Sequence, residues 1–132
     1  MTVGSYDPSA TALSLSLSVV AELLAAATQL EEPNFGLAEQ RIVELAPLAR
    51  QGDNSDWSLM AASLDEVELE NLIRLFTLAE RLPGWSVQAK SPVIPLAREL
   101  KARGRYPEVL TGWIKSHTDN RFLPYGSLMD RL

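Results

Sequence analysis

The sequence predicts an all-α protein, and three observations carry this prediction. Apolar residues recur at helical spacing in long stretches of the 132-residue chain. Pro, Gly and Ser residues stand at the ends of these stretches, where helices begin or end. The one short strand-like alternation, Leu13 to Val19, lies inside a longer helical pattern, and no strand–helix alternation is present. We predict a single domain over residues 1–132, a compact bundle of about five main helices plus one short helix, with a packed C-terminal tail. Two or three stacked helical hairpins fit the same pattern.

The N-terminal third predicts two helices. Residues 1–8 have no periodic pattern and form a loose lead-in. The first helix should run from about residue 9 to 31, where Leu and Ala dominate the second half. Asn34 is the predicted cap of a second helix that reaches about residue 51, with Gly52 as its stop. Pro47 should bend this helix or start a new turn near its end.

The middle of the chain predicts a short helix and a long central one. The short helix spans 56–62 and either ends there or runs straight into the next helix. Ser63 and Glu66 have the spacing of a capping box, which marks the start of a helix that reaches Leu82. This helix is apolar over more than half of its circumference, so it needs partners on two sides. We expect it at the centre, with the first two helices on one flank and the last two on the other.

The C-terminal half predicts two more helices. A turn over 83–89 precedes them, with Trp85 as an anchor over the end of the central helix. Ser91 is the expected cap of a helix that Gly104 closes. Pro95 cannot donate a backbone hydrogen bond, which leaves open an irregular first turn and a regular helix that begins nearer to Pro95.

The last predicted helix spans 107–117, and an apolar segment follows it. The helix should bury Val109, Leu110, Trp113 and Ile114. Residues 118–132 are too rich in apolar side chains for a disordered tail, so we expect them to pack on the body, with a short helical turn at 127–131. The phrase TDNRFLPY at 118–125 is interpreted first as closure of the fold and second as a binding loop.

Composition limits the possible classes of protein. The chain has no cysteine, which excludes disulfides and thiolate metal sites and suits the cytoplasm. The first 18 residues contain no Lys or Arg, so they do not resemble a secretory signal. The apolar run at 13–30 includes Glu22, a Gln and several Ser and Thr residues, and we expect no membrane span.

Charge is unevenly distributed along the chain. Residues 1–80 hold three basic and thirteen acidic residues, a net charge of −10, whereas residues 81–132 hold nine basic and four acidic ones, a net charge of +5. Such asymmetry indicates either a basic surface for an anion or two halves that face each other, within one chain or between copies.

Motifs for catalysis, metals and cofactors are absent from the sequence. The single histidine, His117, has no Glu three positions before it, as a helical carboxylate metal site would need. At a helix end it is better interpreted as a cap of backbone carbonyls. No phosphate-binding or dinucleotide fingerprint appears. We therefore expect no catalytic residue, metal or cofactor, although a cleft of carboxylate and basic side chains would escape detection in a sequence.

The best candidate binding surface is basic and lies in the C-terminal half. Basic residues on and around the 91–104 segment follow helical spacing, and aromatic residues lie close in sequence. The candidate residues are Lys90, Arg98, Lys101, Arg105, Trp113, Lys115, Arg121 and Tyr125.

Three functions fit the sequence, and elimination favours the first. A small helical protein of this kind is predicted to be a protein–protein interaction module or a self-associating accessory protein, with a homodimer as one form. The alternative is single-stranded nucleic acid bound through 90–125, where phosphates meet the basic residues and bases stack on the aromatic ones. The third function is an enzyme that uses a cleft of carboxylate and basic side chains. The acidic chain as a whole, with a pI of about 4.8, repels nucleic acid.

Overall fold

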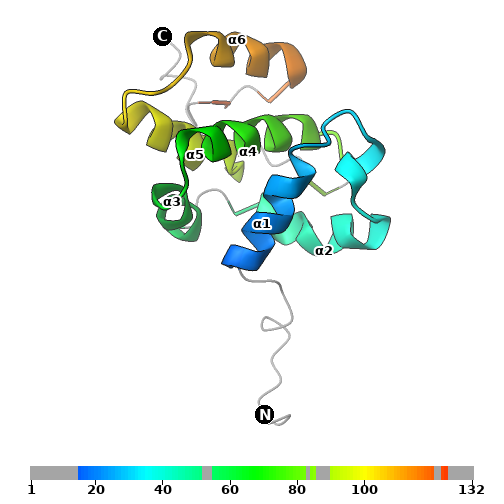
Figure 1. Cartoon of the computed structure of the whole chain (residues 1–132). Coiled ribbons are helices and arrows are strands. Elements are labelled where there is room, and N and C mark those ends of the chain that lie inside the picture. Colours follow the sequence, from blue (N-terminus) through cyan, green and yellow to red (C-terminus); the bar gives the residue numbers. More distant parts are fainter. Residues whose placement is uncertain (1–14, 52–54, 83, 86–89, 121–122, 125–132) are drawn as a thin grey trace, which may run out of the picture.

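The protein is all-α, as the sequence predicts. The computed structural model describes residues 15–51, 55–82, 84–85, 90–120 and 123–124, and this part contains six α-helices, one 3₁₀ turn and no strand (Figure 1). The predicted lead-in, the start of the first helix, the Gly52 stop, Arg121, Tyr125 and the helical turn at 127–131 lie outside the described residues. The elements are α1 (Leu17–Ala26), η3 (Pro33–Gly36), α2 (Glu39–Ala49), α3 (Ser55–Ala62), α4 (Glu66–Ala79), α5 (Val93–Ala102) and α6 (Glu108–His117).

Helix α4 lies at the centre of the bundle. It packs on α1, α5 and α6, and its contact with α5 is the most extensive (Figure 1). Leu69, Leu72, Ile73 and Leu75 on α4 are completely buried. The contacts with α1, α5 and α6 agree with the predicted central position, whereas α2, predicted on the same flank as α1, has no extensive contact with α4. Helix α3 packs instead on α5.

The start of α4 differs from the prediction by two residues. Asp65, not Ser63, is the N-cap: its carboxylate accepts the Glu68 N–H at 2.8 Å, and the Glu68 side chain accepts the Asp65 N–H at 3.0 Å. Ser63 belongs to the turn that ends α3, because its N–H and its hydroxyl both donate to the Met60 carbonyl. Helices α3 and α4 are therefore separate, and α4 ends at Ala79 rather than Leu82.

The N-terminal helices are shorter than predicted. Helix α1 begins at Leu17, because Ser16 has an extended backbone and its hydroxyl accepts the Val19 N–H. The prediction that Asn34 caps α2 is wrong. Asn34 and Phe35 have left-handed backbones, with φ of 51° and 56°, and α2 begins five residues after Asn34. This turn places the Phe35 ring in the core, where it is 5% exposed.

Two tryptophans tie α2 to the centre of the bundle. The Trp57 indole N–H donates to the Leu48 carbonyl at 2.9 Å, and the Trp85 indole N–H donates to the Ile42 carbonyl at 3.0 Å. Both indoles lie beside Phe76 of α4, Trp57 edge-on at 5.2 Å between ring centroids and Trp85 tilted at 6.1 Å. The predicted anchoring role of Trp85 is confirmed, and Trp57 shares it.

Helix α5 begins and ends at local signals. The Ser91 hydroxyl accepts the Val93 N–H, although Pro92 occupies the N-cap position itself. The regular helix begins at Val93, before Pro95, because Pro95 lies in the first turn, where a backbone N–H has no partner within the helix. Gly104 closes α5 as predicted. Its φ is +68°, and the Arg105 N–H donates to the Leu100 carbonyl, which completes a Schellman motif.

Helix α6 matches the predicted bounds, but its buried face is narrower than predicted. Leu110 and Ile114 are completely buried, whereas Val109 is 73% exposed and Trp113 is half-buried. Beyond α6, Asn120 and Leu123 are buried, so the described part of the tail packs on the body as predicted.

Candidate functional site

Two of the predicted basic residues, Arg98 and Lys101, lie three residues apart on one face of α5. A third, Arg105, follows the Gly104 that closes the helix. All three side chains are exposed. We call Arg98, Lys101 and Arg105 the α5 basic surface.

An aromatic ring supports this surface. The Lys101 ammonium group lies 5.3 Å from the centroid of the Tyr106 ring, within the range of a cation–π interaction. The Tyr106 hydroxyl and the Thr111 hydroxyl are hydrogen-bonded at 2.9 Å. Tyr106 is thereby held between the end of α5 and the start of α6.

The remaining candidates occupy other places. Lys90 is exposed ahead of α5, and Lys115 is exposed on α6, where it lines a groove beside the end of α4. The half-buried Trp113 faces α4, because the Arg74 guanidinium lies 4.7 Å from its ring centroid. The structure therefore divides the predicted stripe between α5 and α6, and Arg121 and Tyr125 are outside the described residues.

The basic residues fall into two groups by ion pairing. Arg41, Arg74 and Arg103 each form an ion pair with at least one carboxylate. In the part of the chain that the structure describes, no ion pair joins Lys90, Arg98, Arg105 or Lys115 to a carboxylate. Among the described residues, these exposed charges therefore take no part in ion pairing.

Arg103 is a basic residue that the sequence analysis missed. Its guanidinium donates to Glu99 at 2.8 Å and to Glu66 of α4 at 3.0 Å, and also to the Ala61 and Ala62 carbonyls at the end of α3. The hydrogen bond to Glu99 is the main reason that the pKa of Arg103 is raised. The spacing of four residues between Glu99 and Arg103 was the available signal. Arg103 joins α3, α4 and α5 and is structural.

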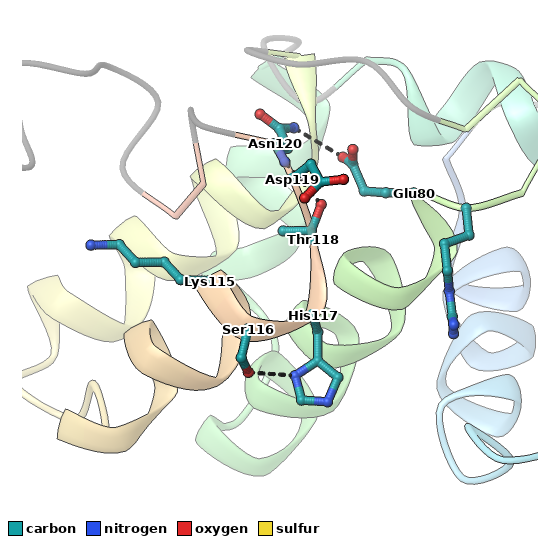
Figure 2. A pocket seen from close by; sticks show the side chains of 8 residues that line it. Glu80, Lys115, Ser116, His117, Thr118, Asp119 and Asn120 are labelled. Carbon is teal, nitrogen blue, oxygen red and sulfur yellow. Dashed lines mark hydrogen bonds between the residues drawn. The ribbon is translucent and has the colours of Figure 1, made fainter.

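A polar groove of about 390 Å³ lies where α4 and α6 end. Figure 2 shows its lining, with Glu80 from the end of α4 and residues 115–120 from the end of α6 and the segment after it. The buried Asn120 donates its amide N–H to Glu80 at 3.0 Å, and its backbone N–H bonds to the Thr118 hydroxyl. The described start of the TDNRFLPY phrase therefore joins the ends of the two helices, as its interpretation as closure of the fold expects.

His117 caps a carbonyl, as predicted. Its Nδ1 lies 2.7 Å from the Trp113 carbonyl, which can only accept, so Nδ1 carries the proton. The Ser116 hydroxyl donates to the same carbonyl at 2.8 Å and lies 2.9 Å from Nδ1. In this arrangement Nδ1 and the Ser116 hydroxyl both donate to the Trp113 carbonyl. The His117 ring stacks on Trp113 at 4.2 Å.

The described residues hold neither a cluster of side chains for a metal ion nor a helix that could cross a membrane. No group of three or more His, Asp or Glu side chains there is arranged to hold a metal ion. None of the helices described has the length and apolar character needed to cross a membrane, the longest being α4 with 14 residues.

Comparisons with known proteins found no match: no protein-family model, no curated protein and no solved structure matches this chain.

Proposed function

We propose that this protein is a protein–protein interaction module that docks through the α5 basic surface onto an acidic protein surface. The observation that carries the proposal is the contrast in ion pairing. Arg98 on α5 and Arg105 just after it are exposed without an ion pair among the described residues, while Arg41, Arg74 and Arg103 are held by carboxylates. Charges that are not used to stabilise the fold remain available to a partner. The cysteine-free composition supports a cytoplasmic setting for this interaction.

The aromatic residues favour a protein partner over single-stranded nucleic acid. Base stacking needs an accessible aromatic face. The Trp113 ring is already in contact with His117 and Arg74, and the Lys101 ammonium group lies over the Tyr106 ring. A nucleobase would have to displace one of these groups in order to stack. The negative charge of the whole chain also opposes a nucleic acid, whereas a short acidic segment of a protein needs only a local basic surface.

The test is a binding titration with two labelled probes, an oligo-glutamate peptide and an oligo-thymidine strand. The variant Arg98→Glu with Arg105→Glu converts two attractions into repulsions. An exposed ion pair contributes up to about 1 kcal/mol, so the two reversals should weaken peptide binding by roughly tenfold or more.

The matched control is Arg50→Glu with Arg81→Glu, which makes the same change in net charge at two exposed residues away from α5. Its affinity for the peptide should stay within about twofold of the wild type. Equal weakening by both variants would show that only net charge matters and would overturn the proposal. Tighter binding of the thymidine strand than of the peptide, lost on reversal of Arg98 and Arg105, would favour the nucleic-acid function instead.

A further inference from the structure

A second charged surface lies at the other end of the molecule. Glu31 and Glu32 precede η3, and Glu39 is the first residue of α2. All three are exposed, and none forms an ion pair within the described chain. We call Glu31, Glu32 and Glu39 the acidic corner.

A mainly apolar hollow lies beside the acidic corner. A hollow of about 260 Å³ is lined by Asn34, Glu39, Ile42 and Val43, and its lining is mainly apolar. The Val43 side chain on α2 is 70% exposed. Apolar surface next to charged side chains is the usual anatomy of a protein interface, in which a polar rim surrounds an apolar centre.

The basic end carries its own exposed apolar side chain. Helix α3 packs on α5, and Arg103 fastens the end of α5 to the last carbonyls of α3. Leu59 on α3 is 71% exposed. Each end of the molecule therefore carries a large exposed aliphatic residue as well as charged side chains that form no ion pair among the described residues.

The two charged surfaces lie at opposite ends of the fold. In Figure 1 the end of α5 and the turn after it lie at the left edge, whereas η3 and the start of α2 lie at the right edge. One molecule cannot bring its own acidic corner onto its own α5 basic surface. A symmetric dimer needs one self-complementary patch, whereas complementary patches at opposite ends favour a head-to-tail contact, which repeats along an open chain unless the rotation closes a ring.

We propose that the partner of the α5 basic surface is the acidic corner of a second copy, and that copies associate head to tail into open chains rather than into a closed dimer. This inference rests on the proposed function, because it names the partner of the same basic surface. The occupant is identified by complementary charge: the exposed Arg98 and Arg105 on one copy meet the exposed Glu31 and Glu32 on the next.

The experiment is sedimentation velocity of the full chain across a range of concentrations, at low and at high salt. The weight-average sedimentation coefficient should rise with concentration without a plateau at the dimer, and it should return to the monomer value in high salt, where exposed charges are screened. A plateau at the dimer would overturn the head-to-tail arrangement, and an unchanged rise in high salt would overturn its electrostatic origin.

Two neutralised variants then test the pairing directly. Arg98→Gln with Arg105→Gln removes charge from the basic surface, and Glu31→Gln with Glu32→Gln removes charge from the acidic corner. Each variant alone should self-associate roughly tenfold more weakly. In an equimolar mixture, one variant keeps the acidic corner and the other keeps the α5 basic surface. The mixture should therefore form a one-to-one dimer that cannot grow further, because both of its outer surfaces are neutralised. The control Arg50→Gln with Arg81→Gln should associate like the wild type.

Failure of this inference is distinguishable from failure of the proposed function. A chain that remains monomeric at every concentration, yet binds oligo-glutamate through Arg98 and Arg105, overturns self-association and leaves the interaction module with another acidic partner. A mixture of the two neutralised variants that stays monomeric, while the wild type self-associates, shows that copies meet through other surfaces and also overturns the inference.

Discussion

Truncation of Phe76 should be among the most damaging changes to the fold. Phe76 is 3% exposed, and both Trp57 and Trp85 lie beside its ring. Removing a buried Phe ring costs about 3–5 kcal/mol. Phe76 also makes two aromatic contacts, each worth roughly 0.5–1.5 kcal/mol beyond the buried area. Phe76→Ala should therefore lower the free energy of unfolding by about 4–5 kcal/mol, the upper end of the range for a buried Phe ring. A domain of 132 residues has a free energy of unfolding of roughly 7–20 kcal/mol, so the variant should still fold.

The assay is urea unfolding followed by tryptophan fluorescence and by circular dichroism. Fluorescence reports directly on Trp57 and Trp85, which should become more accessible to water in the folded variant. The matched control is Leu78→Ala, because Leu78 is a half-buried residue on the same helix. This variant should lower the free energy of unfolding by roughly 1–2 kcal/mol. A loss below about 2 kcal/mol for Phe76→Ala, or one equal to the control, would show that the two indoles do not depend on Phe76.

Two further predictions concern the cap of α4 and the acid stability of the fold. Asp65→Ala should lower the free energy of unfolding by about 0.5–2 kcal/mol in urea titrations, whereas Ser63→Ala should change it by less; the reverse order would contradict the observed cap. The Arg41 guanidinium holds the pKa of Glu22 below its ordinary value of 4.5, so this pair stabilises the fold above that pH and the contribution is lost as pH falls through the lowered pKa. The stability difference between wild type and Glu22→Gln should therefore shrink in acid, and a constant difference would refute the role of the ion pair.

Local signals account for the parts of the fold that sequence reasoning predicted correctly. The bounds of α3 and α6 follow apolar periodicity bounded by loop and turn residues, and Gly104 ends α5 because a left-handed backbone suits a residue without Cβ. The central place of α4 follows from its wide apolar surface, which must be covered on more than one side. Each of these depends on residues close together in the chain.

The errors arose where two local solutions were nearly equal. Ser63–Glu66 and Asp65–Glu68 both have the spacing of a capping box, and the Ser63 bonds to Met60 at the end of α3 decide between them. Asn34 is a good helix cap by type, but burial of Phe35 places both residues in a left-handed turn. At Phe35 the free energy of burying an aromatic ring exceeds the differences in local propensity, so tertiary packing decided that position.

The candidate surface shows the same division. Helical spacing alone predicted that Arg98 and Lys101 share a face, because the period of a helix is local geometry, whereas Arg105 lies beyond the Gly104 that ends the helix. Only the tertiary structure shows that Arg103, from the same segment, reaches Glu66 while its neighbours remain exposed, and that the acidic corner lies at the opposite end. The sequence by itself determined the helical class, the central helix and the charge of each half. Which charges are paired was decided by contacts between residues far apart in the chain, because an ion pair requires proximity in space that no local pattern specifies.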